Sequence, residues 1–200
     1  MKKVIAIFVL TSAFITSKAQ LSFGPKAGLN IAHLSLDNTD KYKFSSRVGF
    51  NGGAFANYKL SDMFAAQIEL LYSGEGENGK ILSNGEKDNI GINFLNVPVL
   101  FQYVSKYGVY AETGPQVGFL LSIKETVGSS SAESIKQYYK SINFGWDFGL
   151  GYKLEKYVPG LGLDVRYALG LIAINKTEVG AGSLKSSFFS VDLFYALKLK

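Results

Sequence analysis

Apolar and polar residues alternate along most of the chain beyond about residue 20. In residues 142–152 every second position is Ile, Phe, Trp, Leu or Tyr, and Asn, Gly or Asp stands between them. A period of two places neighbouring side chains on opposite faces of a β-strand. Each alternating segment reaches the 9–11 residues that a tilted strand needs to cross a bilayer. Eight segments behave in this way, with Phe55 as an exception inside the second: 21–31, 48–58, 64–72, 95–103, 109–121, 142–152, 161–170 and 189–198.

The connections between these segments alternate in length. Three are short, at 59–62, 105–107 and 154–160, and four are long and polar, at 35–46, 74–90, 123–140 and 173–186. Short turns on one side and long loops on the other are typical of outer-membrane barrels, and an even strand number places both termini on the short-turn side. The predicted fold is therefore all-β, an eight-stranded antiparallel up-and-down transmembrane β-barrel.

The direction of the apolar face separates a membrane barrel from a soluble one. A soluble lipocalin-like carrier would turn its apolar face inward and cover its exterior with charged residues. Here the polar positions are mostly Gly, Asn, Ser and Gln, which suit the crowded interior of a narrow barrel. The apolar positions favour lipid contact, and five tyrosines are expected to form an aromatic girdle at the headgroups: Tyr58, Tyr72, Tyr103, Tyr152 and Tyr167.

Residues 1–19 have the pattern of an export signal. A basic start, Met1-Lys2-Lys3, precedes an apolar stretch, and Ser17-Lys18-Ala19 places small residues before a cut at Gln20. Residues 20–200 then form the barrel domain. Removal of the signal leaves 18 basic and 16 acidic residues, so the net charge falls from +5 to +2. No basic run survives to bind nucleic acid.

Composition limits the chemistry that this chain can perform. It has no cysteine and a single histidine, which excludes a thiol nucleophile, a thiolate metal site and a histidine cluster. His33 stands near Ser35 and Asp37 in the sequence. Its place in the alternation predicts a side chain that faces lipid, so a position at the rim of the barrel explains it better than catalysis. Residues 74–80 match the start of a phosphate-binding loop, yet Ile81 occupies the Ser/Thr position. We expect no catalytic residue, cofactor or metal site.

The chain resembles a known family at three places. These are Leu71-Tyr72-Ser73-Gly74, Leu95-Asn96-Val97-Pro98-Val99-Leu100 and Gly114-Pro115. They look like the outer membrane protein beta-barrel family of Bacteroidetes, often called PorT-like or porin-family proteins. The resemblance implies an eight-stranded barrel in the outer membrane. Many such barrels end in an aromatic residue that the barrel-assembly machinery reads, whereas this chain ends Leu197-Lys198-Leu199-Lys200.

The polar faces carry a set of charged residues that should meet at mid-height inside the barrel. Buried charges must be paired or hydrogen-bonded. We expect a salt-bridge plug with Arg166 at its centre, and a polar pathway for ions or small solutes is the alternative. The set consists of Lys26, Glu69, Glu112, Asp147, Asp164, Arg166 and Asp192.

Three classes of function stay open at this point. The first is a structural or surface-interaction barrel, a monomer in outer-membrane lipids. Its loops offer a surface to an extracellular ligand or protein: 35–46, 74–90, 123–140 and 173–186. The second is a narrow channel, and the third is a soluble carrier. Four loop carboxylates also suggest a divalent cation or bridged lipopolysaccharide: Glu75, Glu77, Glu86 and Asp88.

Overall fold

The computed structural model describes residues 20–36, 42–81, 87–128, 131–176 and 183–198. Nearly all of these residues lie in strands. The predicted signal, residues 1–19, is outside the described part. Among the described residues, no helix has both the length and the apolar character needed to cross a membrane. The long strands are β1 (Leu21–Leu36), β2 (Tyr42–Lys59), β3 (Phe64–Ile81), β4 (Lys87–Val104), β5 (Val109–Val127), β7 (Ile142–Lys153), β8 (Leu161–Gly170) and β9 (Leu184–Tyr195).

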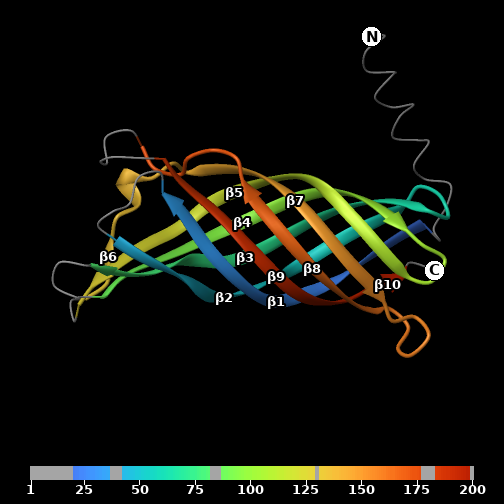
Figure 1. Ribbon diagram of the computed structural model, residues 1–200. Helices are drawn as coiled ribbons and strands as arrows, with labels where there is room; N and C mark the ends of the chain where they lie inside the picture. Colours follow the sequence, from blue (N-terminus) through green and yellow to red (C-terminus); the bar gives the residue numbers. More distant parts are fainter. Residues whose placement is uncertain (1–19, 37–41, 82–86, 129–130, 177–182, 199–200) are drawn as a thin grey trace, which may run out of the picture.

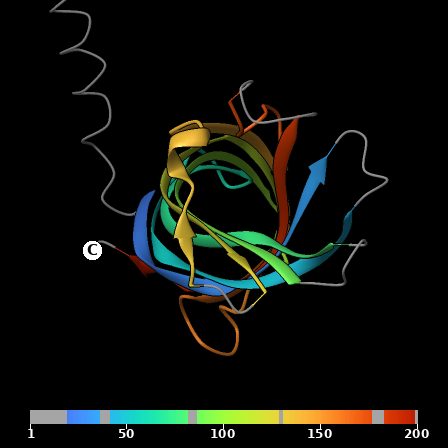
Figure 2. The ribbon, with the colours of Figure 1, turned by 90° about the vertical axis from the view of Figure 1, so that its left-hand side faces the viewer.

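The eight long strands close into a barrel. Each pairs antiparallel with the next along the chain, and β9 pairs with β1 to complete the ring (Figures 1 and 2). Three short elements complete the order: β6 (Glu133–Ser134) pairs with β5, the single-turn 3-10 helix η2 covers Lys136–Tyr138, and β10 (Leu197–Lys198) pairs with β1. The predicted eight-stranded up-and-down barrel is confirmed. Every long strand has a partner on both sides through the apolar belt, as a sheet in lipid requires, whereas β1 and β2 stop pairing beyond Ala32 and Arg47.

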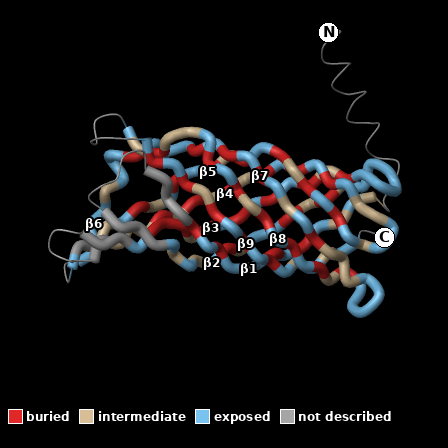
Figure 3. Tube along the Cα trace, in the orientation of Figure 1, coloured by how far each residue is buried: buried red, intermediate tan, exposed pale blue. Residues whose placement is uncertain are grey.

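The side-chain alternation has the predicted orientation. Figure 3 shows buried and exposed positions alternating along the strands. In β7 the polar residues Asn143 and Asp147 are buried, whereas Trp146 and Phe148 are exposed at 38% and 51%. Large apolar side chains on the other strands face outward in the same way, among them Leu29, Phe50, Leu70, Phe101, Phe119, Val165 and Val191. A soluble carrier with its apolar residues inside is therefore the wrong interpretation.

The strands extend further on the long-loop side than the sequence pattern predicts. The segment 74–90, expected to be a loop, is strand up to Ile81 and again from Lys87. The other three expected loops are shortened in the same way, because β1 reaches Leu36, β5 reaches Val127 and β9 begins at Leu184. Beyond the hydrocarbon, outward positions no longer have to be apolar, so the strands continue without the apolar signal.

Several aromatic residues point into the barrel instead of outward. Phe55, the exception in the alternation, is buried and meets Phe194 edge-on with ring centroids 5.5 Å apart. Tyr110 lies beside Phe194 at 6.4 Å. Glycines opposite create the space, since a Cβ atom on Gly151 or Gly162 would overlap the Tyr110 or Phe194 ring. These three rings form an aromatic layer in the bore toward the short-turn end.

Candidate functional site: the charged bore

The seven charged residues selected from the sequence come together inside the barrel. They lie on six strands, β1, β3, β5, β7, β8 and β9, and each is at most 4% exposed. Their alternation with outward apolar residues aims all of them at the barrel axis. Strand shear then decides which of them touch, and the contacts divide into two groups around the two cations, Arg166 and Lys26.

Arg166 on β8 joins two opposite walls of the barrel. Its Nη1 donates to Oε2 of Glu69 at 2.7 Å, and its Nη2 donates to Oε1 of Glu69 at 2.9 Å. Its Nε and Nη2 also donate to Oε1 of Glu112, at 3.0 and 2.7 Å. Such forked contacts to carboxylates are the strong, geometrically specific hydrogen bonds of arginine. Arg166 is thus bonded across the bore to residues of β3 and β5.

Lys26 on β1 holds the second group. Its Nζ donates to Oδ2 of Asp164 at 2.7 Å and to Oε1 of Glu69 at 3.1 Å, and it lies 4.0 Å from Oδ2 of Asp192. Glu69 therefore accepts from both cations and links the two groups. Ser190 adds a hydrogen bond to Asp192 at 2.7 Å.

Acids outnumber bases in this cluster by five to two. Asp147 is the least satisfied of them: it is fully buried, neither carboxyl oxygen has a hydrogen-bond partner, and its Oδ2 lies 3.8 Å from Nη1 of Arg166. Within the part of the chain that the structure describes, no group of three or more His, Cys, Asp or Glu side chains has the arrangement of a metal site.

Uncharged polar side chains continue the network toward the short-turn end. Asn57 donates to Gln67 at 2.9 Å and to Gln102 at 2.8 Å. Gln102 donates to Oε2 of Glu112 at 2.8 Å, and Gln67 donates to Oε1 of Glu69 at 2.6 Å. Glu69 and Glu112 are therefore held by amides on the short-turn side as well as by the cations, so that the network spans the bore.

A second polar layer lies on the long-loop side of the charges, around Glu75. This carboxylate accepts from Ser186 at 2.6 Å, from Ser73 at 2.9 Å and from Asn96 at 3.1 Å. Glu75 was predicted to lie in an outer loop, and that prediction is wrong because β3 continues through it and its side chain is buried in the bore. The signal was present, since Gly74-Glu75-Gly76-Glu77 keeps a period of two, with glycine instead of an apolar residue on the outward face.

An apolar cluster follows at the long-loop end. It packs Ile92, Phe94, Leu120 and Ile123 of β4 and β5 against Tyr139 and Ile174, from the segments that precede β7 and β9, and against Leu184, the first residue of β9. Backbone hydrogen bonds tie these segments together, because Lys140 donates to the Ile174 carbonyl at 2.8 Å. The bore thus holds amides and aromatic rings at the short-turn end, then the charged cluster, then the polar group around Glu75, and the apolar cluster at the long-loop end.

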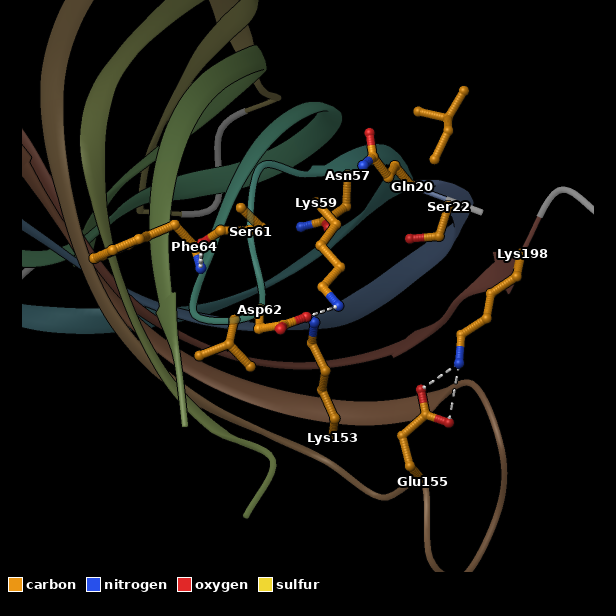
Figure 4. A pocket seen from close by; sticks show the side chains of 13 residues that line it. Gln20, Ser22, Asn57, Lys59, Ser61, Asp62, Phe64, Lys153, Glu155 and Lys198 are labelled. Carbon is orange, nitrogen blue, oxygen red and sulfur yellow. Dashed lines mark hydrogen bonds and ion pairs between the residues drawn. The ribbon is translucent and has the colours of Figure 1, made fainter. Parts of the chain in front are cut away.

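The short-turn end has an open cavity of about 180 Å³ (Figure 4). Lys59 and Lys198 in its lining are paired, with Asp62 at 2.7 Å and Glu155 at 3.1 Å. The hydrogen bond and the charge of Lys59 hold the pKa of the exposed Asp62 carboxyl, in the turn between β2 and β3, below its usual value. Lys153 points into the same cavity, with its Nζ 5.8 Å from the centroid of the Tyr110 ring.

The remaining candidates do not assemble into a site. His33 lies in β1 opposite Ser187 of β9, and Asp37 is outside the described residues. The proposed cation cluster divides, since Glu75 and Glu77 are buried on the bore side and Glu86 is outside the described residues. Residues 74–80 belong to β3 and form no phosphate-binding loop.

Comparisons with known proteins agree with this architecture. The family model described as "Outer membrane protein beta-barrel domain" matches residues 16–175. No curated protein sequence matches the chain. The fold is similar to the crystal structure of Neisserial surface protein A, with a TM-score of 0.56, 16% identity, and coverage of 86% of this chain and 96% of that one.

Two other solved structures show weaker similarity. Ail of Yersinia pestis, in complex with the heparin analogue sucrose octasulfate, has a TM-score of 0.49 and 12% identity over 89% of this chain and 99% of that one. OprG from Pseudomonas aeruginosa has a TM-score of 0.46 and 15% identity over 90% of this chain and 97% of that one.

Proposed function

Because this chain belongs to the family of outer membrane protein beta-barrel domains and lies in the outer membrane, we propose that it is a sealed structural and surface-interaction barrel. Its bore would hold the wall rigid without passing solutes, and its extended strands and loops would face outward. We assign it no catalytic role.

The observation that carries this proposal is the arrangement around Arg166. One guanidinium on β8 bonds to carboxylates on β3 and β5, and a second cation, Lys26, bonds to one of the same carboxylates. A solute path would have to break these buried pairs, and breaking such a pair costs about 3–5 kcal/mol. The aromatic layer of Phe55, Tyr110 and Phe194 adds a second barrier.

Planar-bilayer recording tests the proposal. The purified full chain should give no discrete current steps. The matched positive control replaces Lys26, Glu69 and Arg166 with serine and Phe55, Tyr110 and Phe194 with alanine, and it should conduct if it folds, as judged by heat-dependent gel mobility. Reproducible steps from the wild-type protein, abolished in Arg166→Lys, would instead establish the narrow channel.

The finer family assignment is part of the same proposal. The motifs Leu71–Gly74, Leu95–Leu100 and Gly114-Pro115 support membership of the PorT-like group of Bacteroidetes barrels. Pro98 and Pro115 lie in the adjacent strands β4 and β5. Proline has no backbone N–H group, so each of them removes one hydrogen-bond donor from the barrel wall. A set of related sequences that keeps these prolines and the bore charges together would support the assignment, and one that loses them would oppose it.

The proposed route to the membrane begins with export. Residues 1–19 would direct the chain across the inner membrane, and the barrel-assembly machinery would insert residues 20–200. Within the apolar belt of the described residues the sheet is closed and leaves no edge strand for another copy, which supports a monomer. Light scattering in detergent that gives twice the monomer mass would contradict this.

The surface partner would contact the long-loop end. Residues 131–141 contain β6 and η2 and lie in the connection between β5 and β7. They offer a test because they can be changed without altering either of these two long strands. A short Gly-Ser replacement of 131–134 should abolish binding to the cognate surface in a cell-adhesion assay and leave heat-dependent mobility intact. Equal adhesion by the wild type, this variant and cells without the protein would refute an adhesive role.

A further inference from the structure

A polar hollow lies on the outer wall of the barrel, on the long-loop side of the apolar belt. It has a volume of about 660 Å³ and spans the strands β2 to β5. Two cations, three amides and two hydroxyl groups provide its polar lining: Arg47, Lys124, Asn78, Asn89, Asn93, Ser46 and Thr126. None of the described residues that line it is acidic. We call this site the outer hollow.

Strand register places the outer hollow on the lipid side of the sheet. Gly74 pairs with Asn93, and Gly76 pairs with Gly91, which pairs in turn with Lys124. Directly paired residues share a face, and this face continues in steps of two to the exposed Tyr72. The intervening residues Glu75 and Glu77 are buried on the bore side, so their charges are directed away from the outer hollow.

The height of the outer hollow corresponds to the lipid headgroups. Tyr72 and Phe119 mark exposed apolar residues of the belt, at 42% and 43% exposure. A strand rises about 3.3 Å per residue, so that Gly74 and Gly76 lie roughly 7 and 13 Å further along β3 than Tyr72. The polar headgroup region extends several Å beyond the hydrocarbon, so a group at this height meets headgroups instead of acyl chains.

Glycine makes the hollow and lets Arg47 cross it. The Nη1 of Arg47 donates to the Ile90 carbonyl of β4 at 3.2 Å, although β3 separates β2 from β4. The guanidinium lies over Gly91, where a Cβ atom would approach Nη1 to 2.6 Å. Any larger residue at position 91 would displace the arginine and fill the space.

The two cations are available for a ligand. Neither Arg47 nor Lys124 forms an ion pair with a carboxylate in the described ranges. Arginine and lysine around a space rich in amide donors and without carboxylates match the chemistry of a phosphate group on a polar headgroup. We propose that the outer hollow binds the phosphorylated headgroup of a lipid in the outer leaflet.

Native mass spectrometry of the full chain in detergent tests this, with bisphosphorylated lipid A as the probe and its dephosphorylated form as the reference. The wild type should retain the phosphorylated lipid preferentially. Arg47→Gln with Lys124→Gln should weaken retention by roughly tenfold for each lost charge-assisted contact, or about a hundredfold together. Gly91→Leu should also weaken it. Lys185→Gln, an exposed lysine on β9, is the matched control and should bind as the wild type does.

Two outcomes would overturn the proposal. One is equal retention by the wild type, the double variant and the control, provided that heat-dependent mobility shows all three to be folded. The other is no preference for the phosphorylated lipid. A parallel measurement adds inorganic phosphate. Displacement of the lipid by millimolar phosphate, with the same dependence on Arg47 and Lys124, would assign the site to free phosphate and refute the proposal of a lipid headgroup. Retention of the lipid in the presence of phosphate supports the headgroup.

Discussion

Replacement of Arg166 by leucine removes the charge that two buried glutamates share. In the wild type, Arg166 donates twice to Glu69 and twice to Glu112, over distances of 2.7–3.0 Å. After the substitution Glu69 still contacts Lys26, whereas Glu112 keeps only its hydrogen bond from Gln102. Asp147 also loses its longer contact with the guanidinium, at 3.8 Å. The larger loss is at Glu112, a buried carboxylate, 4% exposed, that is left without a cation.

The expected cost follows from that unpaired charge. Removal of one partner from a buried ion pair destabilises proteins by about 3–5 kcal/mol. Leucine fills much of the arginine volume, so that cavity formation adds little. A second substitution, Glu112→Gln, removes the unpaired charge and keeps the contact with Gln102. The double variant Arg166→Leu/Glu112→Gln should therefore recover more than half of the lost stability, which a pure packing defect would not.

Reversible urea unfolding in phospholipid vesicles gives the measurement. The chain has one tryptophan, Trp146, which faces outward on β7 and reports insertion by its fluorescence. Heat-dependent gel mobility at each urea concentration provides an independent probe. The reasoning is refuted if Arg166→Leu unfolds within about 1 kcal/mol of the wild type, or if the double variant is no more stable than the single one.

Three further predictions concern other parts of the chain. The contact with Lys59 lowers the pKa of Asp62, so this contact stabilises the turn at neutral pH and is lost as the pH falls through the lowered pKa. Lys59→Gln should therefore raise the NMR titration midpoint of Asp62. An unchanged midpoint would disprove the contact. Gly151→Ala should destabilise the barrel by about 1–3 kcal/mol in the same urea assay, because its Cβ meets the Tyr110 ring, and Tyr110→Leu should relieve the defect; a neutral Gly151→Ala contradicts the packing. Intact mass of the protein from outer membranes should correspond to a chain that begins at Gln20, whereas a mass that includes residues 1–19 would rule out the predicted cut.

The membrane explains why the strands could be predicted so directly. Inside the hydrocarbon every outward position must be apolar, so the alternation of residues 142–152 and 161–170 identifies β7 and β8 almost to the residue. Outside the hydrocarbon that constraint disappears. Residues 74–77 keep the period of two, but glycine replaces the apolar residues on the outward face, so the pattern loses the apolar half of its signal although β3 continues to Ile81.

The sequence predicts which charged residues line the bore but not which of them contact one another. Alternation directs Arg166, Glu69 and Glu112 inward, whichever strands they meet. Their contacts depend on the stagger between strands, since Arg166 and Glu69 are 97 positions apart in the chain. The inward aromatic rings of Tyr110 and Phe194 depend on a different feature: the directly paired glycines Gly151 and Gly162 provide their space, and such pairing is visible only once the strands are assembled.

Spin labelling tests the central claim, that the apolar face meets lipid and the charged face fills the bore. The chain lacks cysteine, so single cysteines can be placed at Phe148, Val191 and Glu69 without a background. In vesicles, labels at Phe148 and Val191 should collide readily with oxygen dissolved in the bilayer and poorly with a water-soluble nickel complex, whereas Glu69→Cys should be shielded from both. Labels at Phe148 and Val191 that meet nickel instead of oxygen would contradict the account.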